Sequence, residues 1–218
     1  MIYFVRHGQS TANAGGVTMA HAEIPLSDLG RCQADLVAEL LDVEPVLLLS
    51  STYVRAIDTA RPFSEKTGCP ITPHPLLHEF SALDAGLIEG MVTAQRRPLA
   101  DAFWSTADPD LRHGPGSETF REFSSRVAGF AGELQHLPQD TVLFGHGIWF
   151  ALLCWKLWGF NANDATVMKE FRRFQRALPM PNCAVYGLEQ AGKGQWRLKA
   201  IEAVMQKVCA VAGQAPSG

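Results

Sequence analysis

Short runs of apolar residues, each followed by a polar or glycine-containing turn, recur along the chain. Residues 2–5 (IYFV), 46–51 (VLLLSS) and 141–144 (TVLF) all show this pattern. Uninterrupted β-branched, aromatic and leucine residues are typical of strands that are covered on both faces. We therefore expect these three segments to be buried strands of a mainly parallel sheet.

Segments with helical periodicity follow these strands. Residues 28–41 carry apolar side chains at helical spacing, and Ser27 or Asp28 can cap the first turn. Residues 52–68 predict a second helix and residues 148–158 predict a third. The alternation of strand and helix predicts a three-layer α/β/α sandwich.

Outside this alternation, the chain predicts an insertion and a closing pair of strands. Residues 91–126 mix short helical stretches with Pro and Gly, so we expect a helical insertion that lies over the core. Residues 184–188 and 195–201 predict two final strands. We expect residues 1–210 to form a single domain and residues 211–218 to form a flexible tail.

The composition excludes several classes of protein. At 218 residues with 47% hydrophobic residues, the chain has enough apolar surface for a sizeable core. The formal net charge of −3 provides no basic surface for nucleic acid. Residues 142–160 are long enough for a membrane span, but Gly145, Gly147 and Lys156 interrupt them, so we expect no membrane segment. The first residues also lack the pattern of a cleavable leader.

The cysteines favour a reducing compartment. The chain has five, an odd number, and none of them forms a C-x-x-C motif. We therefore expect a cytoplasmic protein. A homodimer is compatible with the sequence, which does not specify an oligomeric state.

Histidine or arginine follows each of the three predicted strands. His7 comes after Arg6 at the end of the first strand, His146 follows TVLFG, and Arg55 lies four residues beyond Ser51. Crossover connections bring the carboxyl ends of parallel strands to one edge of a sheet, where ligands bind. We expect these side chains to converge there.

Two arginines and two histidines in one pocket suit phosphoryl transfer. Guanidinium groups match phosphoryl oxygens, and a helix N-terminus adds backbone N–H donors. One neutral imidazole can attack phosphorus to form a phosphohistidine, while a second, protonated histidine holds the oxygens as charge develops.

This chemistry requires no metal, and we expect no cofactor. The chain lacks the carboxylate groupings that are typical of magnesium sites. His74 and His78 have helical spacing, but Pro75 lies between them and makes a metal site there improbable.

These motifs resemble the histidine phosphatase superfamily, which includes the cofactor-dependent phosphoglycerate mutases. RHGQSTAN at residues 6–13 has the family pattern R-H-G-x-x-x-x-N. SSTYVRAIDTA at residues 50–60 resembles the element with the second phosphate arginine, and FGHG at residues 144–147 resembles the element with the second histidine. IPLSDLGRCQA at residues 24–34 and PNCAVYGL at residues 181–188 also resemble family elements, in the family's order.

The resemblance implies a phosphoglycerate mutase-like fold and a set of site residues. It makes His7 the nucleophile and His146 the second catalytic histidine. The phosphate-binding residues that it implies are Arg6, Ser10, Asn13, Arg55 and Gly147, the last through its backbone N–H.

Two glutamates compete for the role of general acid. The leaving oxygen needs a proton in one step and water must lose one in the next, and a single carboxyl group can serve both. The family places a Glu after the third strand, where LHEFSALDAGLIEG contains Glu79 and Glu89. We prefer Glu79 because it fits the family pattern L-x-E, although Gly86 follows it later than the corresponding Gly does in the mutases. Glu89 remains the alternative.

We expect a phosphatase that hydrolyses phosphomonoesters of a small phosphorylated metabolite. Residues 91–126 do not resemble the mutase lid, which argues against a phosphoglycerate mutase-type phosphotransferase. A protein phosphohistidine or phosphoprotein phosphatase, with an open pocket, is a further alternative. So is a catalytically silent binding module, although both His7 and His146 are present.

The insertion is rich in cationic residues. We expect at least one of them to turn inward and pair with a second anionic group of the substrate. The candidates are Arg96, Arg97, Arg112 and His113.

Overall fold

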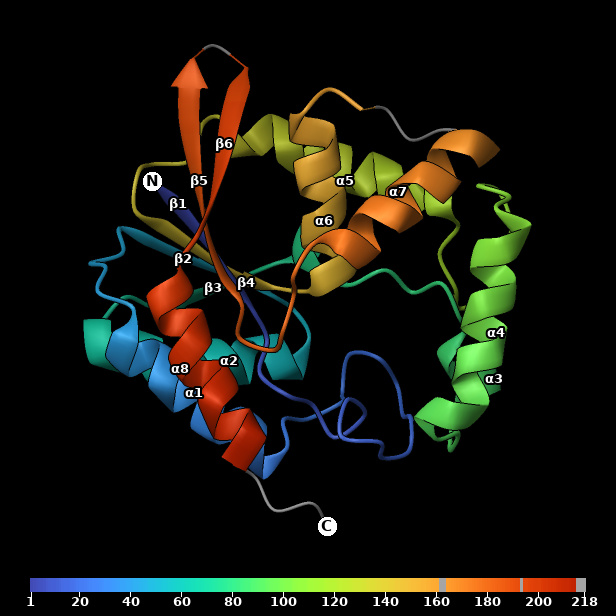
Figure 1. Ribbon diagram of the computed structural model, residues 1–218, viewed down its shortest axis with the longest axis horizontal. Coiled ribbons are helices and arrows are strands. Elements are labelled where there is room, and N and C mark those ends of the chain that lie inside the picture. The colour runs from blue at the N-terminus through green and yellow to red at the C-terminus, as the bar shows by residue number, and fades with distance from the viewer. Residues whose placement is uncertain (161–163, 193, 215–218) are drawn as a thin grey trace.

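A six-stranded sheet forms the centre of the structure, a computed structural model that describes residues 1–160, 164–192 and 194–214 (Figure 1). The strands are β1 (Ile2–Arg6), β2 (Leu47–Ser51), β3 (Ile71–His74), β4 (Thr141–Gly145), β5 (Val185–Gly192) and β6 (Gln195–Ala200). Their order is β3-β2-β4-β1-β5-β6. Strands β1 to β4 are parallel, whereas β5 pairs antiparallel with β1 and β6. The predicted mainly parallel sheet and its closing pair of strands are confirmed.

Helices connect the strands, and three of them follow the predicted pattern. The described helices are α1 (Asp28–Leu40), α2 (Val54–Thr67), the 3-10 helix η1 (Pro75–Leu77), α3 (Ala85–Ile88), α4 (Thr93–Thr106), α5 (Phe120–Leu134), α6 (Gly147–Leu157), α7 (Ala165–Ala177) and α8 (Glu202–Gln214). The three predicted helices correspond to α1, α2 and α6.

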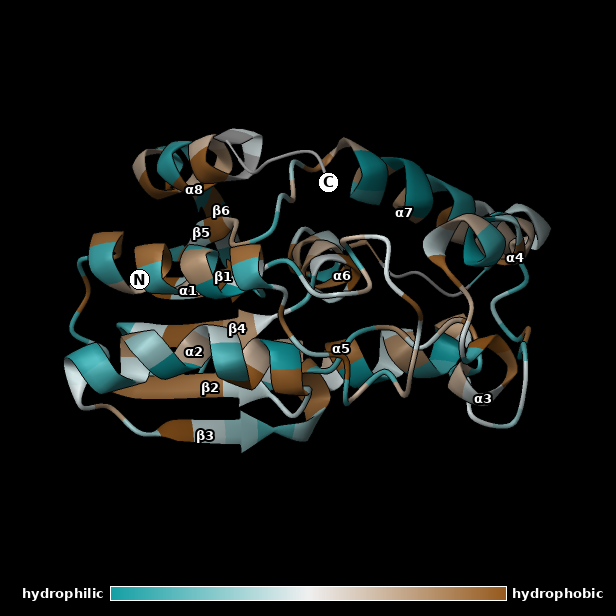
Figure 2. Ribbon diagram, turned by 90° about the horizontal axis from the view of Figure 1, so that it is seen from below, coloured by the Kyte–Doolittle hydropathy of each residue, from teal (hydrophilic) through white to brown (hydrophobic). Residues whose placement is uncertain are grey.

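Helices cover both faces of the sheet, which confirms the three-layer arrangement. On one face, α1, α2 and α8 bury Val37, Phe63 and Val208 against β1 and β4. On the other face, α5 and α6 bury Phe130 and Phe150. Hydrophobic and hydrophilic stripes alternate along α1 and α2, as burial of one side of each helix requires (Figure 2).

Local signals explain where several helices begin and end. Ser27 Oγ accepts a hydrogen bond from Gly30 N at 3.1 Å and caps α1, as the sequence predicts. Gly68 ends α2 with a φ of 71°, a left-handed conformation that glycine adopts without steric cost. Thr119 and Glu122 form a capping box at the start of α5.

Both views place α3 and α4 beyond the carboxyl ends of the parallel strands (Figures 1 and 2). We call residues 84–119, which include these two helices, the lid. Residues 120–126, which the sequence assigns to the insertion, form the first half of α5, and Phe120 and Phe123 are buried in the core. The inserted segment therefore ends at Thr119.

Two C-terminal helices lack a clear sequence signal. Polar residues dominate α7, and only Met168 and Phe171 in it are buried. α8 extends to Gln214, so residues 211–214 of the predicted tail are helical, while residues 215–218 lie outside the described residues.

The register of the parallel strands aligns the ends that carry the predicted site residues. Arg6 of β1 pairs with Gly145 of β4, and Ser50 of β2 pairs with Phe144. The residues that follow each strand consequently emerge at one edge of the sheet. Residues 142–160, the segment whose length is sufficient for a membrane span, form most of β4 and all of α6. None of the described helices is long and apolar enough to cross a membrane.

Candidate active site

Three predicted site residues meet at this edge of the sheet. His7 follows β1, His146 follows β4, and Arg55 lies in the first turn of α2. The ring centroids of the two histidines are 5.1 Å apart, and the Arg55 guanidinium contacts both rings. The exposed fractions are 4% for His7, 7% for Arg55 and 0% for His146. Together these residues form a buried cationic cluster.

The hydrogen bonds of His7 determine its tautomer. Its Nδ1 lies 2.7 Å from the carbonyl oxygen of Gly8, which can only accept, so Nδ1 carries the hydrogen. Its Nε2 accepts a hydrogen bond from Arg55 Nε at 3.3 Å. Burial, followed by the charges of Arg55 and Arg6, lowers the pKa of His7 well below its usual value. His7 is therefore neutral, with a lone pair on Nε2.

His146 is neutral for similar reasons. Its Nδ1 lies 3.3 Å from Arg55 Nη2, which can only donate, and its Nε2 therefore donates to Ser51 Oγ at 2.8 Å. Burial and the charge of Arg55 lower the pKa of His146 well below its usual value. The hydrogen bonds and the burial of His146 thus support a neutral ring and not the protonated histidine expected from the sequence.

Both arginines have fixed positions. Arg55 Nη1 donates to the carbonyl oxygen of His21 at 2.6 Å, and burial lowers the pKa of Arg55 to about 10, which leaves it charged at neutral pH. Arg6 Nη1 donates to the carbonyl oxygen of Met180. Among the described residues, Arg6 Nε is buried without a hydrogen-bond partner, so this donor is available to an anion.

Ser10 and Asn13 bond to each other across a tight turn. Ser10 N donates to Asn13 Oδ1 at 3.3 Å, and Asn13 N donates to Ser10 Oγ at 3.2 Å. Asn182 Nδ2 donates to Asn13 Oδ1 at 3.2 Å. These contacts stabilise the loop after His7. In them, the side-chain oxygens of Ser10 and Asn13, the two predicted phosphate-binding residues, accept hydrogen bonds from within the protein.

Glu79 lies beside the cluster, at the start of α6. Its Oε2 accepts from Ile148 N at 3.0 Å, and its Oε1 accepts from Trp149 N at 2.9 Å. Its charge acts on both Arg6 and Arg55. Glu89, in contrast, is exposed at the C-terminal end of α3. The structure brings Glu79, and not Glu89, to the cluster.

Gly147 allows the start of α6 to approach Arg6 closely. A Cβ atom added at this position would lie 3.5 Å from Arg6 Nε and 3.1 Å from Met180 Cγ. The N-terminal end of α6 therefore packs closely against Arg6, and helix N-termini favour bound anions.

A second group of polar residues lies near His146, and the sequence motifs assign a role to none of them. Tyr53 packs edge-on against the His146 ring at 5.2 Å between centroids. Its hydroxyl lies 3.3 Å from Ser81 Oγ, which is also 3.2 Å from His21 Nδ1. Ser51, noted in the sequence only as a strand end, is the hydrogen-bond acceptor for His146. No periodicity or motif marks His21 or Ser81, because both lie in irregular loops.

The lid cations have different environments. Arg112 is bonded to Glu122 and to the carbonyl oxygen of Ser117, and His113 Nδ1 accepts from Asp84 N at 3.3 Å. Arg96 and Arg97 line a cavity between α4 and α7. No group of three or more potential metal ligands occurs among the described residues.

Comparisons with known proteins identify the family to which this chain belongs. The sequence profile of the histidine phosphatase superfamily (branch 1) matches residues 2–203. A glucosyl-3-phosphoglycerate phosphatase of Mycolicibacterium vanbaalenii is 30% identical over 178 residues, which cover 77% of this chain and 78% of the relative. A probable phosphoglycerate mutase of an Enterobacter species is 27% identical over 84% of this chain and 82% of its own length. The crystal structure of the alpha-ribazole phosphatase from Shigella flexneri superposes with a TM-score of 0.70 at 26% identity, over 91% of this chain and 94% of that one.

Proposed function

We propose that this chain, which belongs to the histidine phosphatase superfamily, hydrolyses small phosphomonoesters through a phosphohistidine intermediate. It is a phosphomonoesterase, in common with its phosphatase relatives. The observation that carries the proposed mechanism is the tautomer of His7, whose Nε2 lone pair is ready for attack without loss of a proton.

The first step transfers the phosphoryl group to His7. The Nε2 lone pair forms a bond to phosphorus as the bond from phosphorus to the ester oxygen breaks. Arg55 Nε donates to Nε2 in the structure, so this donor must pass to a phosphoryl oxygen before attack. Arg6 Nε and the Gly147 N–H bind the other oxygens, and the Ser10–Asn13 turn positions the loop beside them.

Glu79 is the residue that donates a proton in the first step and accepts one in the second. It is a carboxylate in the structure, takes up the proton of the bound phosphomonoester monoanion, and donates this proton to the departing ester oxygen. In the second step it accepts a proton from water, whose oxygen forms a bond to phosphorus as the bond to Nε2 breaks. The products are the alcohol and inorganic phosphate, and both His7 and Glu79 return to their starting forms.

His146 responds to the charge of the substrate. Burial and cationic neighbours depress its pKa. A bound phosphoryl dianion offsets those charges and favours uptake of a proton at Nδ1, which then donates to a phosphoryl oxygen. The histidine that the sequence predicts to be protonated thus reaches that state only in the complex.

The substrate in this proposal is a small phosphorylated metabolite. The phosphatases among the relatives are named for small phosphorylated metabolites, and the residues of the cluster are almost fully buried, which favours a small substrate over a folded phosphoprotein. The mechanism uses no cofactor. We place the enzyme in the cytoplasm because all five cysteines are free in the described residues.

A substrate panel tests the proposal. We expect hydrolysis of an aryl phosphate such as para-nitrophenyl phosphate, then of selected sugar phosphates, phosphorylated acids or nucleotides, with slower release from phosphopeptides. Chelators should leave the rates unchanged. Absence of hydrolysis throughout the panel would favour a silent binding module, and isomerisation of a phosphoglycerate in place of phosphate release would favour a mutase.

A further inference from the structure

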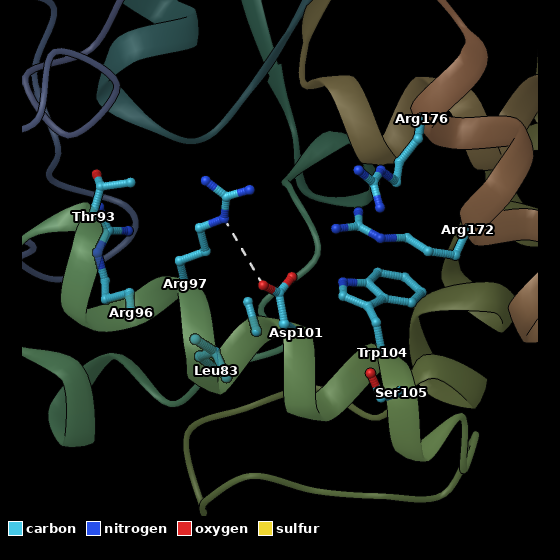
Figure 3. A pocket seen from close by; sticks show the side chains of 10 residues that line it. Leu83, Thr93, Arg96, Arg97, Asp101, Trp104, Ser105, Arg172 and Arg176 are labelled. Atoms are coloured by element: carbon cyan, nitrogen blue, oxygen red, sulfur yellow. Dashed lines mark hydrogen bonds and ion pairs between the residues drawn. The ribbon is translucent and has the colours of Figure 1, made fainter.

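A cavity of about 640 Å³ lies between α4 of the lid and α7 (Figure 3). Arg97 extends from α4 into this space, and Arg172 and Arg176 point into it from α7. Its volume is in the range of small-molecule binding sites. Neither His7 nor His146 lines it, so the cavity is distinct from the buried cluster.

Positive charge in this cavity exceeds negative charge. Four arginines line it, with Arg96 as the fourth, and Asp101 is the only acidic residue among the described lining residues. The ion pair between Asp101 and Arg97 spans 3.9 Å between two well-exposed side chains, so water screens it. Burial and the neighbouring charge of Arg176 lower the pKa of Arg172. An oxyanion bound here would offset the repulsion between the two guanidiniums.

The guanidinium of Arg172 is held in place before any ligand arrives. Its central carbon lies 4.6 Å from the centroid of the Trp104 ring, and Nη1 donates to Gln175 Oε1. Trp104 is itself buried against Phe171. Because stacking restricts the Arg172 side chain, little conformational entropy remains to be lost when an anion binds.

Both walls of the cavity are connected to the catalytic cluster. At one end of α4, Thr93 Oγ1 donates to the carbonyl oxygen of Ala12, in the loop that follows His7. Beyond the C-terminal end of α7, the carbonyl oxygen of Met180 binds Arg6. Burial and the charges of Arg55 and of Arg96, which lines the cavity, lower the pKa of His21 to about 4, so His21 lies within electrostatic reach of both the catalytic cluster and the cavity.

We infer that Arg97, Arg172 and Arg176 form a second oxyanion subsite, which binds a carboxylate or phosphate at the far end of the phosphomonoester. This inference rests on the proposed function, because it assigns a role to the part of the substrate that is released. The preferred substrates are therefore phosphorylated acids or bisphosphates, and α7 contributes to their selection.

Three substrates of matched length test the subsite. We would compare butyl phosphate, phosphorylated hydroxybutanoate and butanediol bisphosphate, and repeat the set with hexyl chains. The wild type should prefer the second anion by about tenfold or more in kcat/KM at one of the lengths, the factor for a charge-assisted hydrogen bond. Comparison of the acid with the bisphosphate identifies which oxyanion the subsite takes.

Variants of α7 assign the preference to named residues. Arg176→Gln and Arg172→Gln should each remove most of the preference, mainly through KM, and leave butyl phosphate hydrolysis within about twofold of wild type. Arg173→Gln is the matched control, since Arg173 is exposed on the same helix and does not line the cavity. Asp101→Asn should increase the preference for a second anion, because it removes the carboxylate of Asp101 from the cavity. Equal preference in all variants would overturn the subsite.

A binding measurement keeps the subsite testable without turnover. Calorimetry with butylphosphonate and phosphonobutanoate, which cannot be hydrolysed, should show tighter binding of the carboxylate compound to the wild type and a loss of this difference in Arg176→Gln. If the difference in binding is present but no phosphomonoester is hydrolysed, the proposed function fails and the subsite stands. If esters are hydrolysed but the two phosphonates bind equally in every protein, the subsite fails alone.

Discussion

Hydrogen bonds fix the proton positions on both histidines of the site. The Gly8 carbonyl oxygen assigns the hydrogen of His7 to Nδ1, and Arg55 assigns the hydrogen of His146 to Nε2. Because burial and the arginines also depress both pKa values, the free site holds two neutral rings beside two cations. A phosphoryl dianion balances the two positive charges of Arg6 and Arg55, whereas a neutral ligand leaves them unbalanced.

The two candidate acids should respond differently to loss of the carboxyl group. Glu79→Gln should slow alkyl phosphates by about a hundredfold or more, yet affect activated aryl phosphates far less, since a good leaving group needs little protonation. Glu89→Gln is the control, and its exposed position predicts a small effect on both substrates. Steady-state rates over a series of leaving groups measure the difference, and a large leaving-group effect in Glu89→Gln alone would transfer the role to that residue.

Ser51 acts as a positioning residue for His146. Ser51→Ala removes the acceptor for the Nε2 hydrogen while Arg55 still donates to Nδ1, so we expect the tautomer to be kept with an unbonded Nε2–H and kcat to fall about tenfold, the effect of one lost buried hydrogen bond. The imidazole nitrogen chemical shifts report the tautomer directly. Ser50→Ala is the matched control, because Ser50 is equally buried but its hydroxyl donates to the Ser51 carbonyl oxygen. An unchanged kcat in Ser51→Ala, or nitrogen chemical shifts that place the hydrogen on Nδ1, would contradict the assignment.

At the scale of elements, the strand ends could be predicted from the sequence to a greater extent than the lid. The strands that carry His7 and His146 are apolar runs, and parallel pairing requires their ends to meet, so the site could be located from pattern alone. The lid is irregular, and its contacts are between residues that are distant in sequence. Its shape, and which of its cationic side chains turn inward, therefore could not be predicted. The same applies to His21, whose carbonyl oxygen holds Arg55.

Asp84 connects the two halves of the lid. Its Oδ1 accepts from Gly86 N at 2.9 Å and its Oδ2 accepts from Gly116 N at 2.7 Å, which joins the start of α3 to the turn before α5. Asp84→Ala should therefore speed tryptic cleavage at the lid arginines while the sheet and its helices stay folded. Glu89→Ala, in the same part of the lid, should be cleaved as slowly as wild type. Equal cleavage of all three proteins would show that Asp84 does not hold the lid.

At the scale of the whole molecule, a charged cluster inside an apolar core makes stability depend on pH. The strands and helices of the two cores close around His7 and His146, and His21 lies under the lid with a pKa of about 4. These native histidines take up protons only at a pH below that of unfolded histidines. The unfolded chain therefore binds more protons than the native chain under mildly acidic conditions.

Acidification should lower the free energy of unfolding in a defined window. Stability should be constant above a pH of about 6.5 and fall below it, by up to about 1.4 kcal/mol per pH unit for each of these histidines. The contribution of His21 should level off near pH 4. Urea unfolding over this range measures the slope, and His21→Asn should reduce it. A stability that rises on acidification would contradict the neutral state of the buried histidines.

The most direct test of the account is capture of the phosphorylated enzyme. Wild-type protein mixed with an aryl phosphate that carries a radiolabelled phosphoryl group, and quenched within one turnover, should retain label in a bond that is stable to base and labile to acid. His7→Ala should retain no label and show no turnover, while Glu89→Gln should be labelled like wild type. Normal turnover by His7→Ala, or an adduct that survives acid, would contradict a phosphohistidine at His7.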